Sequence, residues 1–346
     1  MRSNDSVLFS LWLHGPSSRK VGSLCLNATD KALTDVMLRL GLQSLVKVTG
    51  QMAYIVQVGS VSDRCMSWVT QVIKRRRHLA LVQALRMLRL HKTRFDGLLT
   101  NIFDVLKKYD AKFTFPIVGS VALKNPGLVR FILGSGHEVA VHGYRHVRYA
   151  SLSAEQQESD VRMAVDVFKR LAVPVRGFRA PYNGYTEDTP AIVEKLGFLW
   201  DIGIGYNPKY RSLTTPFKIG VDDHQSKFTC IPLNEWSDDL MIDSYGFNDY
   251  QISMTLKRVM KEASKKQAMV MFDLHPIRVG QPSYVNALKQ AVEYGTMLNG
   301  WFPSVSEAVE WWNRKRSWKH DAVFCCLLTG DIDTVTFIDY IKRIYQ

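Results

Sequence analysis

The segment Gly136-His-Glu-Val-Ala-Val-His-Gly-Tyr-Arg-His146 joins an apolar strand to two histidines. The run 138–141 has the length and composition of a buried strand. His142 and His146 are four residues apart, so on a helical turn they would share one face and could share a metal ion. Folds with alternating strands and helices place their active sites at the C-terminal ends of the strands. The segment therefore predicts a site at a strand end.

Around this segment, predicted helices alternate with short apolar strands. The expected helices are 98–109, 126–133, 154–171, 189–196, 250–266, 283–297 and 304–315. The expected strands are 112–118, 138–141, 176–179, 198–202 and 268–274. This alternation predicts a parallel sheet or a barrel.

Three other short motifs lie at the end of a predicted strand or at the start of the region in which helices and strands alternate. In Phe272-Asp-Leu-His-Pro276, Asp273 and His275 are two residues apart, so they point to the same side of a strand. A carboxylate beside an imidazole can fix its tautomer and raise its pKa, which suits a general acid. Arg179-Ala-Pro-Tyr182 offers a forked cation to a carboxylate or an oxyanion. Arg94-Phe-Asp-Gly97 offers Asp96 as a turn residue or a metal ligand.

Together these motifs make residues 92–276 resemble the polysaccharide deacetylases, the NodB-homology group of carbohydrate esterases. Residues 100–115 look like the family's first helix and second strand. Residues 136–146 look like its second motif, 178–182 like its third, and 274–276 like its last. The resemblance implies a distorted (β/α) barrel, preceded in this chain by an N-terminal α/β extension.

The resemblance also implies a set of roles for individual side chains. Asp96, His142 and His146 are expected to hold a divalent metal, most plausibly zinc, with cobalt, nickel or manganese as alternatives. Arg179 is expected to orient an acidic group, and His275 to protonate the leaving amine with support from Asp273 or Asp201. The residues expected to contact the substrate are Pro181, Tyr182 and Trp200.

The acidic motif departs from the family pattern. The family has two consecutive acids before glycine, the first a base and the second a metal ligand, but Phe95 precedes Asp96 here. Glu187 and Asp188 are alternative candidates for the base. Near the C-terminal end of the sequence, Asp331 and Asp333 could also bind a cation, although two acids beside a glycine are more typical of a turn.

The chain is expected to contain three regions. Residues 1–91 form an extension with a basic amphipathic helix, residues 92–315 form the barrel, and residues 316–346 form an appendage packed on it. The basic cluster Lys74-Arg-Arg-Arg77 lies in the predicted helix 63–91. It is interpreted as a solvated helix face or as a contact with an anionic membrane. Nucleic acid is disfavoured because interleaved aromatic residues are missing.

Composition and charge limit the classes of protein that need to be considered. The 346 residues are 46% hydrophobic and carry a net charge of +13, which is ordinary globular composition with a basic excess. An odd number of cysteines, five, and no CxxC spacing predict reduced thiols. With no export signal apparent, a cytoplasmic protein is expected.

The expected function is removal of an acetyl group from an N-acetylated sugar, which is lipid- or nucleotide-linked if the protein is cytoplasmic. Two alternatives stay open. One is a hydrolase of small non-peptide C–N bonds, since the same barrel resembles allantoin-type hydrolases. The other is a catalytically silent glycan-binding barrel, which Phe95 in the place of the usual base favours.

Overall fold

The computed structural model describes two short strands and most of the C-terminal part of the chain. The described residues are 8–9, 24–25, 94–210, 213–233 and 236–335. The chain divides into two compact units, Met1–Arg75 and Arg76–Gln346. In the first unit, β1 (Leu8–Phe9) and β2 (Leu24–Cys25) pair antiparallel.

Two expectations for the N-terminal part fall outside the described residues. They are the domain boundary after residue 91 and the basic helix that contains Lys74–Arg77. Within the part of the chain that the structure describes, no helix is both long enough and apolar enough to span a membrane.

The second unit is built on one curled parallel sheet. Along the sheet the strands are β10 (Met269–Asp273), β12 (Phe324–Thr329), β3 (Thr114–Ile117), β4 (Glu138–Val141), β5 (Gly177–Phe178), β6 (Trp200–Asp201) and β9 (Thr229–Cys230). Each neighbouring pair on this path is parallel. A bridge between Ser237 and Asp273 brings the chain after β9 back to the end of β10. The expected distorted α/β barrel is confirmed.

Two smaller strand pairings complete the sheet structure. β11 (Gly300–Trp301) pairs parallel with the start of β12. β7 (Gly220–Val221) and β8 (His224–Gln225) form a separate antiparallel hairpin.

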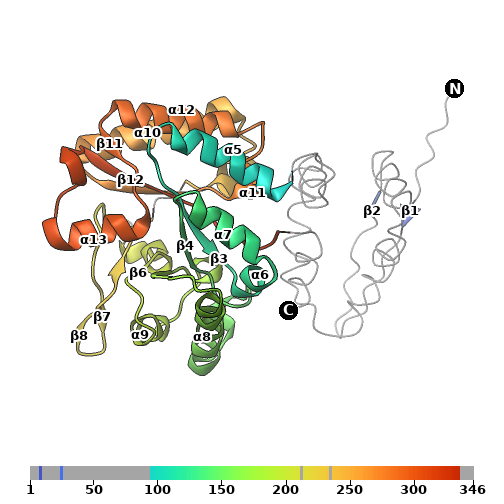
Figure 1. Cartoon of the computed structure of the whole chain (residues 1–346), viewed down its shortest axis with the longest axis vertical. Coiled ribbons are helices and arrows are strands. Elements are labelled where there is room, and N and C mark those ends of the chain that lie inside the picture. The colour runs from blue at the N-terminus through green and yellow to red at the C-terminus, as the bar shows by residue number, and fades with distance from the viewer. Residues whose placement is uncertain (1–7, 10–23, 26–93, 211–212, 234–235, 336–346) are drawn as a thin grey trace. The chain divides into compact units, whose positions relative to one another are not determined.

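Helices cover the sheet, and most begin and end within a few residues of the predicted bounds. They are α5 (Phe95–Lys107), α6 (Gly119–Lys124), α7 (Pro126–Gly134), α8 (Ala154–Arg170), α9 (Thr189–Lys195), α10 (Asp249–Lys266), α11 (Pro276–Val279), α12 (Val285–Met297) and α13 (Val305–Lys315). Helix α12 packs against α10 and α5, whereas α8 packs against α6 and α9 (Figure 1). Capping boxes start α8, α10 and α13, at Ser153, Asn248 and Ser304.

The central strands are buried on both faces. In β12, Cys326 and Leu328 belong to the larger hydrophobic cluster, whereas Cys325 and Leu327 belong to a second cluster with Trp200. Alternate residues of a strand point to opposite faces, so a strand covered on both sides reads as a continuous apolar run.

The prediction that residues 316–346 form an appendage is wrong for the strand they contain. Every residue of β12 is buried, and the strand lies between β10 and β3 (Figure 1). An apolar run of five residues is stable only where both of its faces are covered and its backbone groups are paired. The C-terminal part of the chain therefore supplies a central strand of the barrel.

A stability measurement distinguishes a central strand from an appendage. We expect Leu327→Ala to lower the free energy of unfolding by about 2 to 5 kcal/mol, because Leu327 is fully buried. The matched control is Leu123→Ala on α6, where the leucine is 45% exposed and the change should stay within about 0.5 kcal/mol. Equal stability of the two variants in urea denaturation would contradict the central placement.

Candidate metal centre and active site

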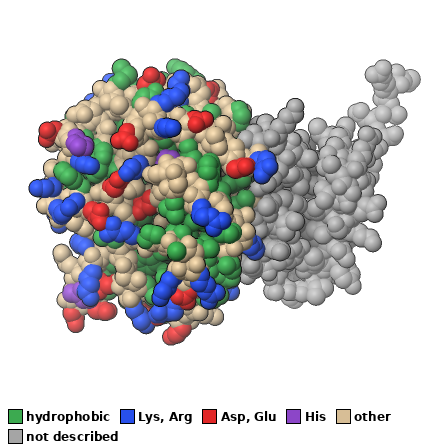
Figure 2. Space-filling model, viewed as in Figure 1, with side chains coloured by type: hydrophobic (Ala, Val, Ile, Leu, Met, Phe, Trp, Pro, Cys, Tyr) green, Lys and Arg blue, Asp and Glu red, His purple; other side chains and the backbone are tan. Residues whose placement is uncertain are grey.

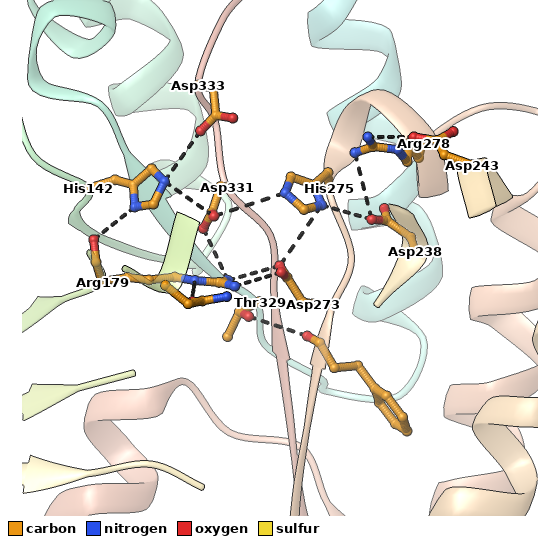
Figure 3. A network of polar contacts seen from close by, with 12 residues as sticks. His142, Arg179, Asp238, Asp243, Asp273, His275, Arg278, Thr329, Asp331 and Asp333 are labelled. Atoms are coloured by element: carbon orange, nitrogen blue, oxygen red, sulfur yellow. Dashed lines mark hydrogen bonds and ion pairs between the residues drawn. The ribbon is translucent and has the colours of Figure 1, made fainter. Parts of the chain in front are cut away.

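The chemistry-bearing side chains gather where parallel strands end. His142 follows β4, Arg179 follows β5, and His275 follows β10. Asp331 and Asp333 follow β12. Since parallel strands all point the same way, their C-terminal ends meet at one edge of the sheet. Figure 3 shows these side chains converging, with Asp331 between His142 and His275.

One group at this edge has the composition of a metal site. His142, His146 and Asp333 each offer one ligand atom, and these three atoms lie within 4.8 Å of one another. Asp333 Oδ1 is 3.4 Å from His142 Nε2 and 3.2 Å from His146 Nε2. Two ligands of a tetrahedral ion, each about 2.1 Å from it, are roughly 3.4 Å apart. The three residues therefore fit a divalent cation.

The hydrogen bond of His142 supports this fit. His142 Nδ1 lies 2.8 Å from the carbonyl oxygen of Arg179, which can only accept, so Nδ1 carries the proton. The lone pair on Nε2 then faces carboxylate oxygens of Asp331 and Asp333, at 3.3 and 3.4 Å. Burial lowers the pKa of His142, but these two carboxylates raise it further, so the net shift is upward. When Nε2 is unprotonated, a cation among these groups would relieve the repulsion between its lone pair and the carboxylates.

A buried carboxylate shapes the loop between the two histidines. His142 and His146 lie on an irregular loop, so the expected helical turn is wrong. Asp160 on α8 accepts hydrogen bonds from the backbone N–H groups of Tyr144 and Arg145, at 2.9 and 3.2 Å. Gly143 has φ +69°, and a Cβ there would lie 2.8 Å from Asp160 Oδ2. Glycine at 143 thus lets Asp160 approach the loop closely.

A second carboxylate that follows β12, Asp331, belongs to a buried ion network. Arg179 is 1% exposed and forks onto Asp273, with distances of 2.9 and 2.6 Å. It also donates to Asp331 at 3.2 Å. Burial raises the pKa of Asp273, but Arg179 and the nearby histidines His275 and His142 together outweigh it, so the net shift is downward. For Asp331, burial dominates and raises the pKa, despite Arg179 and His142.

His275 faces this network from the opposite side. Its Nδ1 lies 2.7 Å from Asp238 Oδ1, and its Nε2 lies 4.0 Å from Asp331 Oδ2. Burial lowers the pKa of His275, but Asp273 and Asp238 raise it from 6.5 to about 10. The imidazole is therefore protonated at neutral pH and can donate a proton from Nε2.

The carboxylate that directly contacts the His275 ring is not one of the two expected from the sequence. Asp273 is paired with Arg179 and lies 4.0 Å from His275 Nδ1, so Asp238 is the direct partner. Asp201 is 1% exposed and accepts a hydrogen bond from the backbone of Ile204. Burial raises the pKa of Asp201 to about 7. The prediction of Asp273 or Asp201 as the direct partner is thus corrected.

The expectation that Asp96 is a metal ligand is also wrong. Asp96 lies in the first turn of α5, is 57% exposed and pairs with Arg94 at 3.3 Å. Within the described residues, the ligand group with His142 and His146 contains Asp333 instead. The physical reason is that Phe95 and Asp96 begin a helix rather than end a strand.

Of the other expected site residues, Tyr182 lies beside His146, whereas Trp200 is buried away from the site. The ring of Tyr182 lies with its centroid 4.3 Å from that of His146, next to buried Pro181. Trp200 is fully buried and donates from Nε1 to Ser306 at 2.9 Å, so its predicted contact with substrate is wrong. A strand alternates its side chains, and this ring faces away from the site.

The structure also favours a different carboxylate over Glu187 and Asp188, the alternative candidates for the base. Glu187 and Asp188 are exposed in the loop before α9, whereas Asp331 faces His142. The interpretation of Asp331 and Asp333 as an ordinary turn is therefore corrected. The sequence does contain a pattern for these residues, since two acids directly follow an apolar run. The order of the strands in the sheet, which the sequence does not give, is needed to place that run beside the histidines. Asp238 had no local signal, because its partner is 37 residues away.

Known proteins resemble this chain over its central part. Residues 95–199 match the polysaccharide deacetylase family. A peptidoglycan-N-acetylglucosamine deacetylase of Bacillus cereus is 26% identical over 48% of this chain and 75% of its own length. A peptidoglycan deacetylase of Helicobacter pylori is 28% identical over 36% and 42%, so the chain spans under half of that relative.

A solved structure agrees in fold. A polysaccharide deacetylase-type structure from Mycobacterium smegmatis aligns with a TM-score of 0.55 at 19% identity, over 64% of this chain and 78% of that one. The matched range 95–199 contains His142, His146 and Arg179, while the acids on the β12 side lie beyond it. Residues 95–199 of the chain therefore match the polysaccharide deacetylase family, and the barrel that the described residues form agrees in fold with a structure of that type.

Proposed function

We propose that this chain is a metal-dependent deacetylase of an N-acetylated sugar, with zinc as the most plausible metal. The observation that carries the proposal is the placement of Asp331 between two histidines. His142 Nε2 lies 3.3 Å from Asp331 Oδ2, and His275 Nε2 lies 4.0 Å from the same oxygen. A metal-ligand set, a base and an acid thus surround one small volume.

His142, His146 and Asp333 would hold the metal. When bound, a divalent cation would polarise the acetyl carbonyl and acidify an attacking water. Asp331 takes the proton of that water, because its carboxylate borders the ligand set. Arg179 holds Asp331 and Asp273 in place through its buried fork. Amide hydrolysis then needs only a proton for the leaving nitrogen.

His275 supplies that proton from Nε2. Asp238 accepts the hydrogen bond from Nδ1–H, which fixes the orientation of the ring and favours its charged form. Breaking of the C–N bond, with proton donation to nitrogen, yields acetate and the free amine. After release, Asp331 carries the proton removed from water, and solvent exchange restores both groups.

The alternatives from the sequence now have less support. Phe95 favoured a silent barrel, but it is a core residue of α5, and Asp331 offers the carboxylate that it lacks. Hydrolysis of a small C–N bond uses the same groups. Release of acetate from N-acetylglucosamine oligomers, compared with hydrolysis of a cyclic ureide, separates the two activities. No turnover of either substrate by the metal-loaded protein would overturn the proposal.

Three further expectations stay predictions. They are a lipid- or nucleotide-linked sugar, contact of Lys74–Arg77 with an anionic membrane, and a cytoplasmic location. The face drawn in Figure 2 mixes Lys and Arg with Asp and Glu, so this face offers no single-sign surface for a membrane. Vesicle sedimentation with acidic and neutral lipids tests the contact.

The first prediction concerns the metal ligands. We expect Asp333→Asn to weaken zinc binding at least about 100-fold, because a ligand oxygen with its charge is lost. Asp96→Asn is the matched control and should leave the affinity unchanged, since Asp96 pairs with Arg94 in solvent. Affinity is measured by competition with a chromophoric chelator. The reverse order of effects would restore Asp96 as the ligand.

The second prediction concerns the base. We expect Asp331→Asn to lower turnover by about 10² to 10⁴ while the metal content stays near that of the wild type. An amide has the same shape but cannot take a proton from water. Acetate release and metal analysis of the same preparation measure the two properties. Near-normal turnover would transfer the role to another carboxylate.

The third prediction concerns the pH dependence. His275 acts in its protonated form, so activity falls as the pH rises through its pKa. Asp238→Asn removes one of the carboxylates that raise this pKa, so the alkaline limb of kcat/KM should move to lower pH. The control is Asp239→Asn, the exposed neighbouring residue, with an expected smaller shift. An unmoved limb in Asp238→Asn would separate Asp238 from the acid.

A further inference from the structure

We propose that Asn183 is a positioning residue, whose side-chain oxygen holds the guanidinium of Arg179 in the orientation that keeps the Asp331 carboxylate in place. The inference rests on the proposed function, in which Asp331 is the base. Asn183 lies just beyond the predicted motif 179–182, and it acts through Arg179 rather than on the reacting atoms.

A tight turn brings Asn183 back to Arg179. The backbone N–H of Asn183 donates to the carbonyl oxygen of Ala180 at 3.0 Å. Tyr182 and Asn183 both have positive φ, at 60° and 50°. This left-handed region is costly for most side chains, and asparagine is among the residues that tolerate it best. Two successive left-handed residues reverse the chain, so a side chain four positions after Arg179 reaches its guanidinium.

The guanidinium of Arg179 is held along two of its edges. On one edge, Nε donates to Asn183 Oδ1 at 2.9 Å. On the other, Nη1 and Nη2 donate to Asp273 at 2.9 and 2.6 Å, and Nη1 also donates to Asp331 at 3.2 Å. Figure 3 shows the contacts of Arg179 with these two carboxylates. Because the group is planar and Arg179 is 1% exposed, partners on two edges fix its orientation.

A neutral acceptor suits this position. The Nε–H of arginine can only donate, so the oxygen of the Asn183 amide faces it and the amide nitrogen points away. Arg179 already interacts electrostatically with Asp273, Asp331 and Asp333. An uncharged oxygen satisfies the buried Nε–H without adding a further carboxylate that would compete for the charge of Arg179.

The hydrogen bond to Asp331 depends most on this orientation. At 3.2 Å it is the longest of the four, and its donor, Nη1, is shared with Asp273. The fork on Asp273 can tilt as a unit, because both partners are side chains with rotatable bonds. Asn183 opposes such a tilt from the Nε edge. Its loss should therefore loosen Asp331 first, which lowers turnover and leaves substrate binding unchanged.

Two substitutions separate the acceptor from the backbone conformation. Asn183→Gly keeps access to positive φ but removes the oxygen, whereas Asn183→Asp keeps an oxygen acceptor. With the metal-loaded full chain and an N-acetylglucosamine oligomer, we expect Asn183→Gly to lower kcat about 10-fold while KM changes less than about 2-fold. Asn183→Asp should restore kcat to within about 3-fold of the wild type. Metal content should stay near that of the wild type in both variants.

The matched control is Asn299→Gly. Asn299 also has positive φ, 56°, and its side-chain nitrogen donates to the carbonyl oxygen of Asp321 at 3.2 Å. It directly precedes β11, which pairs with the start of β12, so it lies at the edge of the sheet opposite the site. This variant should keep the wild-type kcat. An equal loss of kcat in the two glycine variants would make the role of Asn183 merely structural and overturn the inference.

A spectroscopic measurement tests the hydrogen bond without turnover. The zinc-loaded full chain is labelled with ¹⁵N and ¹³C, and the Nε–H signal of Arg179 is assigned through the carbons of its own side chain. A buried, hydrogen-bonded N–H exchanges slowly with water. We expect exchange at least about 10-fold faster in Asn183→Gly and slow exchange in Asn183→Asp.

The exchange rates also separate this inference from the proposed function. If no N-acetylated sugar is hydrolysed, the proposed function fails, and faster exchange in Asn183→Gly still supports the hold of Asn183 on Arg179. Unchanged exchange in Asn183→Gly overturns the inference. So does an active wild type whose Asn183→Gly variant keeps full turnover.

Discussion

The position of β12 between β10 and β3 is the constraint on which the site depends. Five of its six buried residues belong to the two hydrophobic clusters, and its end delivers Asp331 and Asp333 to the edge where His142 and His275 lie. A strand slipped by one residue would exchange its two faces, because side chains alternate along it. The hydrophobic packing of β12 thus fixes the register that places the carboxylates.

Burial of so many charges at one edge requires compensation. Arg179 offsets part of the negative charge by its fork to Asp273 and its contact with Asp331. A single arginine leaves carboxylates facing the lone pair of His142, and burial without a counter-charge is costly. A divalent cation is the natural complement of this arrangement. The same charges that disfavour an empty site therefore favour metal binding.

The two sides of the site are held by different elements. On the metal side, Asp160 of α8 ties down the loop that carries the histidines. On the acid side, Arg278 of α11 ties down the segment that carries Asp238. Both anchors are side chains on helices packed against the sheet, so the helical layer positions the chemistry as well as covering the core. Such indirect supports fix ligand orientation and proton affinity.

The sequence by itself determined the alternation of helices and strands, the placement of the two histidines after a strand, the Arg179 turn and the strand that leads to His275. Those features are local, since a few neighbouring residues specify the periodicity, the caps and the strand ends. Only the tertiary structure decided that Asp333, rather than Asp96, lies beside His142 and His146 and that Asp238 contacts His275. These contacts join residues 191 and 37 positions apart, 333 − 142 and 275 − 238. No local pattern specifies such a pair, because strand order in the sheet, rather than order in the chain, brings its members together.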